Sequence, residues 1–196
     1  MTSPEQPGTS GTPSEPAYPD RVYRSVLAML GGLLLLGVGL WMGVDAMIRG
    51  DGRTPWVAAA SLLLGVPLVV AFTFRPAVYA NDDRMRVRNP FRTVVVPWGA
   101  VDALRATYST EVVTHDGAKY QLWAVPVSMR QRKLAVRSGG KVLVGAESTL
   151  HELRTLAEQN AVRPTAKGDP ECRWAYEVLA PAAAGLVALV LLLALA

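Results

Sequence analysis

Residues 82–101, DDRMRVRNPFRTVVVPWGAV, decide the fold of the middle of the chain. Charged and apolar side chains alternate over residues 84–89, and a second run of strand-forming residues follows at 92–96. Alternation with a period of two is typical of a strand with one buried face. Asn89 and Pro90 between the runs favour a turn. The stretch therefore predicts the first hairpin of a small antiparallel sheet.

Further short runs predict more strands on both sides of this hairpin. We expect these strands at residues 77–81, 101–107, 111–115, 119–125 and 141–145. Asp116-Gly117 is a strong hairpin signal, because both residues accept a positive φ. A helical pattern follows, in which Thr149 and Glu152 fit a capping box and Leu150, Leu153 and Leu156 form an apolar stripe. The sequence thus predicts seven short strands and then one amphipathic helix, an α+β arrangement.

Three apolar stretches flank this region, at residues 25–44, 56–74 and 178–196. Each holds about twenty residues, and a helix of that length spans about 30 Å, the thickness of the hydrocarbon core. We expect a membrane-spanning helical hairpin before the sheet and a third transmembrane helix at the C-terminal end. A buried core helix is the alternative for the first stretch. A re-entrant or interfacial helix is the alternative for the last.

Composition divides the chain into five segments. Residues 1–20 are rich in Pro, Ser, Thr, Gly and Glu, so we expect a disordered tail. Residues 21–74 carry the two-span hairpin, and residues 75–161 form the soluble domain. Residues 162–177 contain two prolines and a glycine and are expected to form a linker. The third span follows at residues 178–196.

Basic residues are distributed unevenly around the apolar stretches. One side carries Arg21, Arg24, Arg75, Arg84, Arg86, Arg88 and Arg92, and the other side carries Arg49 and Arg53. The positive-inside rule therefore places the N-terminus and the middle domain in the cytoplasm. We expect a multi-pass protein of the cell membrane.

The middle of the chain resembles the bacterial PH-like domains of actinobacterial membrane proteins. The resemblance is carried by the hairpin at residues 82–89, the Asn-Pro-Phe-Arg turn at 89–92, the Val-Pro-Trp step at 96–98 and the Asp-Gly turn at 116–117. It implies a bent, seven-stranded partial β-barrel of two near-orthogonal sheets, closed at one end by the C-terminal helix. Two transmembrane helices before such a domain also look like the family. Many members have no known biochemical activity, so the resemblance implies a fold more than a function.

Two basic groups are candidates for contact with anionic lipid head groups or with a protein partner. The first group is Arg84, Arg86, Arg88 and Arg92, and the second contains Arg130, Arg132 and Lys133. The alternating arginines of the first group share one strand face, close to the end of the second apolar stretch. A basic residue near an anionic leaflet contributes about 1 kcal/mol to membrane binding. The alternative is a solvated strand face, which is ordinary in antiparallel sheets.

The sequence contains no recognisable constellation for catalysis, metal binding or cofactor binding. Its one cysteine, Cys172, excludes an intramolecular disulfide and a multi-cysteine metal site. His115 and His151 have no clustered carboxylates around them in sequence, as a metal site would need. Glycine-rich phosphate-binding motifs are missing, and the basic groups lack the aromatic platform of a nucleic-acid surface. We therefore expect neither an enzyme nor a nucleic-acid-binding protein.

These expectations describe a non-enzymatic binding or scaffold module held at the inner leaflet. Its expected partners are the lipid bilayer, anionic head groups, a membrane or cytoplasmic protein, or a second copy of the chain. The alternative is a regulatory subunit of a small membrane transporter or channel. Transport would call for ionisable residues within the spans, and the three apolar stretches contain none.

Overall fold

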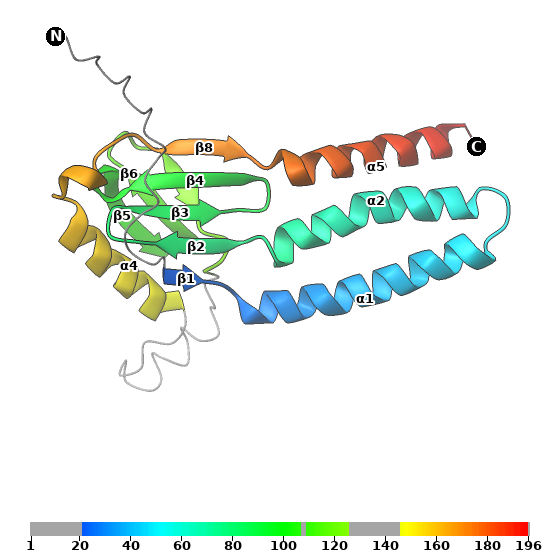
Figure 1. Ribbon diagram of the computed structural model, residues 1–196, viewed down its shortest axis with the longest axis horizontal. Helices are drawn as coiled ribbons and strands as arrows, with labels where there is room; N and C mark the ends of the chain where they lie inside the picture. Colours follow the sequence, from blue (N-terminus) through cyan, green and yellow to red (C-terminus); the bar gives the residue numbers. More distant parts are fainter. Residues whose placement is uncertain (1–20, 107–108, 126–145, 196) are drawn as a thin grey trace, which may run out of the picture.

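Residues 21–106, 109–125 and 146–195 are described by the computed structural model (Figure 1). Their strands form a five-stranded sheet and a three-stranded sheet. Three long helices extend side by side from one end of the larger sheet, and a fourth helix covers the opposite end of the β domain (Figure 1). The expectations for residues 1–20 and for a strand at 141–145 lie outside the described residues.

The three long helices are α1 (Val26–Arg49), α2 (Thr54–Thr73) and α5 (Tyr176–Ala194). Each is long and apolar enough to cross a membrane. Ser25 caps α1, because its Oγ accepts a hydrogen bond of 3.3 Å from the Ala28 amide. α2 has Pro55 in its first turn. Proline is tolerated there, because a backbone N–H at that position has no hydrogen-bond partner within the helix.

α5 is a continuous helix that lies against α2 and is held at both ends. At the β domain, Arg75 forms an ion pair of 2.5 Å with Glu177 in the first turn of α5. At the far end, Arg53 donates hydrogen bonds to the carbonyl oxygens of Leu192 and Leu195, at the C-terminus of α5. A cation is favourable there, because the last carbonyl groups of a helix have no partner within the helix.

The five-stranded sheet is antiparallel, with the order β1-β2-β3-β4-β8. Its strands are β1 (Arg21–Tyr23), β2 (Ala77–Ala80), β3 (Arg84–Arg88), β4 (Arg92–Pro97) and β8 (Glu171–Trp174). The predicted turn at Asn89 and Pro90 connects β3 to β4, and the Asn89 amide donates to the Arg92 carbonyl at 2.8 Å. The alternating runs at residues 84–89 and 92–96 therefore pair as the sequence indicates.

The three-stranded sheet is also antiparallel and contains β5 (Val101–Ala106), β6 (Thr110–Thr114) and β7 (Lys119–Gln121). A short 3-10 helix, η1 (Trp98–Ala100), leads into it from β4. The predicted turn at Asp116-Gly117 connects β6 to β7. Gly117 has a φ of 83°, which favours glycine, and its amide donates to the Thr114 carbonyl at 2.8 Å.

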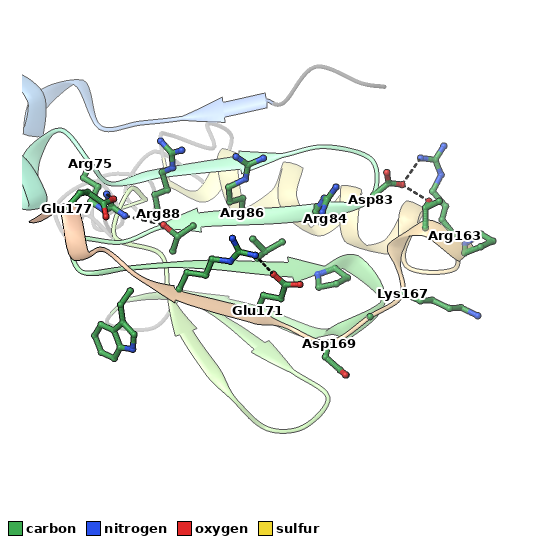
Figure 2. A pocket seen from close by; sticks show the side chains of 18 residues that line it. Arg75, Asp83, Arg84, Arg86, Arg88, Arg163, Lys167, Asp169, Glu171 and Glu177 are labelled. Atoms are coloured by element: carbon green, nitrogen blue, oxygen red, sulfur yellow. Dashed lines mark hydrogen bonds and ion pairs between the residues drawn. The ribbon is translucent and has the colours of Figure 1, made fainter. Parts of the chain in front are cut away.

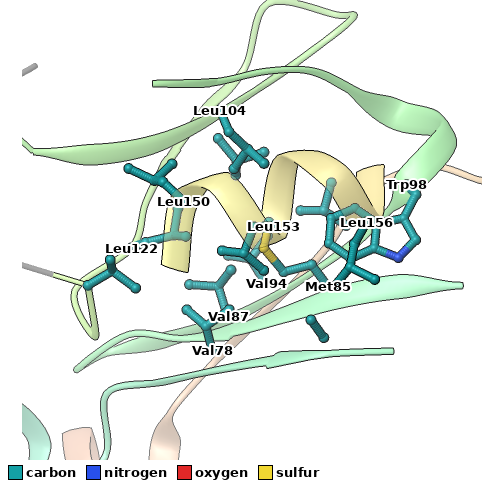
Figure 3. Packing of buried hydrophobic residues seen from close by; sticks show 14 of the residues in the cluster. Val78, Met85, Val87, Val94, Trp98, Leu104, Leu122, Leu150, Leu153 and Leu156 are labelled. Atoms are coloured by element: carbon teal, nitrogen blue, oxygen red, sulfur yellow. The ribbon is translucent and has the colours of Figure 1, made fainter. Parts of the chain in front are cut away.

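α4 (Ala146–Asn160) packs its apolar face between the two sheets (Figure 3). Leu150, Leu153 and Leu156 project from the helix toward the core (Figure 3). Trp98 is completely buried, and its Nε1 donates a hydrogen bond of 2.7 Å to the Asn81 carbonyl. This bond satisfies the indole N–H, which requires an acceptor when it is buried.

The structure corrects several expectations about the β domain. The described residues contain eight strands rather than seven, in two open sheets rather than a partial barrel. β1 comes from the segment expected to belong only to the membrane hairpin, and β8 comes from the expected linker at 162–177, which also contains η2 (Pro164–Ala166). Neither strand shows an apolar alternation, because both are edge strands that pair mainly through the backbone.

Two expected helix starts are also wrong. α4 begins at Ala146, so Thr149 lies inside the helix and is not its N-cap. Thr54 followed by Pro55 is the pattern of an N-cap and the first helical residue, but α2 begins at Thr54 itself and Arg53 occupies the cap position. Glu152, the expected partner in the capping box, instead forms an ion pair of 2.5 Å with Arg21.

The antiparallel register aligns the strand ends with the long helices. One edge of the sheet is the edge from which α1, α2 and α5 emerge. The strand residues at this edge are Tyr23, Ala77, Arg88, Arg92 and Trp174. At 3.3 Å per residue, Arg84 at the other end of β3 lies about 13 Å farther from the helices than Arg88. Positions along β3 therefore differ in their distance from the helices.

Candidate functional site

A basic groove runs across the outer face of the five-stranded sheet, on the side away from the core (Figure 2). Met85 and Val87 of β3 point into the core and are completely buried. The alternating Arg84, Arg86 and Arg88 therefore share the opposite face, as the sequence predicts. A cavity of about 1350 Å³ lies on this face and extends over β4 and β8. We call it the outer groove.

Basic side chains predominate in the outer groove. Its charged residues are Arg75, Asp83, Arg84, Arg86, Arg88, Arg163, Lys167, Asp169, Glu171, Arg173 and Glu177. Seven of these are basic and four are acidic, which leaves an excess of three positive charges. A groove with an excess of one sign of charge attracts ligands of the opposite sign.

The acidic residues of the groove are largely occupied by neighbouring cations. Glu177 pairs with Arg75, and Glu171 lies 3.5 Å from Arg173 (Figure 2). Asp83 accepts a hydrogen bond of 2.6 Å from Thr165 and lies 3.9 Å from Arg163. Among the described residues, no ion pair joins Arg84 or Arg88 to a carboxylate. The net positive charge is therefore concentrated along β3.

Three arginines lie around the ring of Tyr79, next to the end of the groove that is nearer the helices. The Cζ atoms of Arg24, Arg86 and Arg88 lie 5.9, 5.7 and 5.2 Å from the ring centroid. Arg24 Nη2 also donates a hydrogen bond of 2.6 Å to the Tyr79 hydroxyl. We call these four residues the Arg–Tyr cluster. A guanidinium within about 6 Å of an aromatic ring is attracted by the ring's electron density.

Sequence reasoning missed Arg24 and Tyr79 as site residues. Arg24 directly follows β1 and precedes α1, and Tyr79 lies on β2 opposite Arg86. The signal for Tyr79 is its place between Val78 and Ala80 on β2. Because those two residues are buried, the side chain of Tyr79 lies on the outer face. The contact with Arg24 could not be predicted, because it depends on the pairing of β1 with β2.

Arg92, another predicted contact residue, does not join the outer groove. Arg92 lies on the inner side of its sheet, like Val94 and Val96, and its Cζ is 6.0 Å from the centroid of the Tyr120 ring. It is therefore on the face opposite to that of Arg84, Arg86 and Arg88. Arg130, Arg132 and Lys133 lie outside the described residues, so the structure does not place them.

An aromatic contact joins α2 to the β domain. Phe72 in the last turn of α2 lies edge-on to Phe91, with the ring centroids 5.3 Å apart. Its centroid lies 5.5 Å from that of Trp123, which follows β7. Such edge-to-face pairs are favourable beyond the area that they bury. The end of α2 is thus packed against both the β3–β4 turn and the second sheet.

Several titratable residues outside the groove interact with neighbouring side chains. His115 Nδ1 lies 3.7 Å from Asp102, and both side chains are exposed. The Thr114 hydroxyl donates a hydrogen bond to Asp116 and lowers the pKa of that carboxyl group. Burial, together with the neighbouring Glu152, raises the pKa of Tyr23 to about 12. In the described ranges, no group of three or more His, Cys, Asp or Glu residues could hold a metal ion.

Comparison with known proteins identifies the β domain. Residues 75–157 match the family model described as a bacterial PH domain. No curated protein and no solved structure matches the chain. The matched range includes β2 to β7 and most of α4, whereas β1, β8 and the three long helices lie outside it. PH domains are generally non-catalytic modules. Residues 75–157 of this chain therefore form a bacterial PH-like domain, as the sequence resemblance predicted.

Proposed function

We propose that this protein is a membrane-held, non-enzymatic binding module that presents its outer groove to anionic ligands at the inner leaflet. The observation that carries the proposal is the excess of positive charge on one face of a sheet whose edge leads into three apolar helices. The family supports a binding role, because PH domains generally lack catalytic activity.

The arrangement of the helices supports a fixed position at the membrane surface. β1 leads directly into α1, α2 leads directly into β2, and β8 leads directly into α5. When these helices cross a bilayer, the adjoining edge of the five-stranded sheet lies at the level of the head groups. The excess of basic residues on this side of the helices favours the cytoplasmic leaflet under the positive-inside rule.

The length of the groove suggests two kinds of contact. Its near end contains Arg75 and Arg88 and lies within reach of lipid head groups. Its far end contains Arg84, Arg163 and Lys167, and Arg84 lies about 13 Å farther out. That distance exceeds the Debye length of about 8 Å at physiological salt, so the surface potential of the lipid is weak there. We propose that the far end binds an acidic segment of a membrane or cytoplasmic protein.

Purification of the tagged, full-length chain from native membranes tests this function. The material that co-purifies is identified by mass spectrometry of both proteins and lipids. The groove variant carries Arg84→Glu and Arg86→Glu, and the matched control is Lys119→Glu, an exposed basic residue of β7 on the second sheet. We expect specific partners that are retained by the control and lost from the groove variant. Identical co-purifying proteins and lipids in all three samples would contradict a binding role for the groove.

A further inference from the structure

The Arg–Tyr cluster gathers three positive charges around one aromatic ring, beside the near end of the outer groove. Three guanidinium groups lie within 6 Å of one ring centroid. Like charges gathered around one ring repel one another, and for Arg24 and Arg88 the cation–π attraction to that ring offsets the repulsion only in part. No described carboxylate forms an ion pair with Arg24 or Arg88. The cluster is therefore suited to an added anion.

The chemistry of the cluster favours a phosphate group. A guanidinium offers a planar pair of N–H donors that matches two oxygens of a phosphate. Tyr79 holds the groups in place, because its hydroxyl accepts from Arg24 while its ring contacts Arg86 and Arg88. Glu177, a carboxylate on which the charge of Arg88 acts, is already bound by Arg75 at 2.5 Å.

The position of the cluster indicates where the phosphate comes from. Arg88 is the last residue of β3, at the edge where the long helices begin. Arg24 is two residues before α1, so it marks the level at which the first apolar helix starts. The phosphate groups of a bilayer lie just outside the ends of helices that span its hydrocarbon core. A lipid phosphate can therefore reach these two side chains without leaving the bilayer.

We infer that the Arg–Tyr cluster binds the phosphate group of an anionic phospholipid of the bilayer that surrounds the long helices. The inference rests on the proposed function, since it names the ligand of the near end of the groove. Arg24 and Arg88 contact the phosphate, and Tyr79 positions both arginines. Arg84, on the same face of β3 but about 13 Å farther from the helices than Arg88, does not take part.

The test uses the full-length chain in a neutral detergent and measures bound lipid by native mass spectrometry. The probes are dioleoylphosphatidylglycerol, the neutral dioleoylphosphatidylcholine, and inorganic phosphate alone. The cluster variants are Arg24→Gln and Arg88→Gln. Arg84→Gln probes the far end of the groove, and Lys119→Gln, an exposed basic residue of β7 on the second sheet, is the matched control. Loss of a charge-assisted hydrogen bond is expected to weaken phosphatidylglycerol binding about tenfold in each cluster variant. Binding by the control is expected to remain at the wild-type level.

A second pair of variants separates binding from folding. Arg88→Lys keeps the charge but lacks the planar fork, so its affinity should lie between those of the wild type and Arg88→Gln. Tyr79→Phe keeps the ring but frees Arg24, so it should weaken binding less than Arg24→Gln. Thermal unfolding without added lipid should be the same for the wild type and for these variants, apart from small changes. Lipid affinity that simply follows thermal stability across the set would overturn the inference.

Other outcomes reject the inference in distinct ways. Equal weakening by Arg84→Gln and Arg88→Gln would mean that the whole groove binds lipid diffusely, which leaves the proposed function in place. Binding of inorganic phosphate as tight as that of phosphatidylglycerol would mean that the ligand is soluble. Wild-type lipid affinity in both cluster variants, combined with loss of a co-purifying acidic protein, would assign the cluster to a protein partner.

Discussion

Asn89 shows how a single turn residue connects the two sheets. Its Nδ2 donates a hydrogen bond of 2.8 Å to the Gln121 carbonyl, and its Oδ1 accepts one of 3.3 Å from the Trp123 amide. The side chain is almost fully buried. The sequence predicts a turn at this position, but it does not reveal these bonds, because their partners lie more than thirty residues away.

We expect Asn89→Ala to lower the free energy of unfolding by about 1–3 kcal/mol, because it removes the partner of the Gln121 carbonyl and of the Trp123 amide in partly buried bonds. Denaturant unfolding of the full-length chain in mild detergent, followed by tryptophan fluorescence, measures this loss. Gln121→Ala is the matched control, since Gln121 contributes its carbonyl to the bond while its side chain is exposed. The control should change stability by less than about 0.5 kcal/mol. Equal stability of the two variants would contradict a stabilising role for the hydrogen bonds of Asn89 between the two sheets.

Tyr23 provides a pH-dependent contribution to stability. Its pKa is raised from 10.0 to about 12, because burial disfavours the phenolate. The folded state therefore keeps a proton that the unfolded state loses, so this contribution is present below pH 10 and is lost as the pH rises toward 12. Between pH 10 and pH 12 the free energy of unfolding should therefore fall less steeply for Tyr23→Phe than for the wild type. Identical slopes would contradict the raised pKa.

At the scale of elements, the packing of α5 against α2 depends on one glycine. A Cβ atom added to Gly185 would lie 2.7 Å from the carbonyl carbon of Leu63 and 2.8 Å from the Cα of Leu64. These are backbone atoms, so they cannot move aside as a flexible side chain can. Gly185 therefore permits the close approach of the two helix backbones that small residues allow in membrane helices.

We expect Gly185→Val to force α5 away from α2 and to destabilise the helix pair by about 1–3 kcal/mol. The matched control is Gly37→Val in α1, because a Cβ at Gly37 has no neighbouring atom within 4 Å. Thermal unfolding in detergent should show a lower midpoint for Gly185→Val than for the control. Equal midpoints would mean that α5 does not pack on α2 through this position.

The elements also show how much of the fold could be predicted. The β3–β4 and β6–β7 hairpins were predicted correctly, since alternation and turn residues are local signals. β1 and β8 were missed, because short edge strands pair through the backbone and need no apolar period. The start of α4 was misplaced, because Thr149 and Glu152 match a capping box but stand within the helix.

The candidate site was predicted in part for similar reasons. The shared face of Arg84, Arg86 and Arg88 follows from the period of a strand. The prediction that Arg92 joins them was wrong. Arg92 lies two residues before Val94 on β4, so its side chain is on the same face as the buried Val94 and Val96. The Arg–Tyr cluster could not be predicted, since it combines residues from β2, β3 and the segment before α1.

For the whole molecule, the short connections between strands and helices fix the orientation of the groove. The five-stranded sheet is bordered by β1 and β8, and each of these strands continues almost directly into a long helix. The Phe72–Phe91 contact and the Arg75–Glu177 ion pair add side-chain links at the same edge. The PH-like domain is therefore held against the helices by several connections and is not suspended from a flexible linker.

The central claim, that this domain stands at the cytoplasmic face of the membrane, is tested most directly through Cys172. It is the one cysteine of the sequence, and it is exposed on β8. A control protein carries Cys172→Ser and Asp51→Cys, which moves the thiol to the exposed connection between α1 and α2. With a membrane-impermeant maleimide, we predict that Cys172 is labelled only after the cells are permeabilised, while the control is labelled in intact cells. Labelling of Cys172 in intact cells would contradict the account.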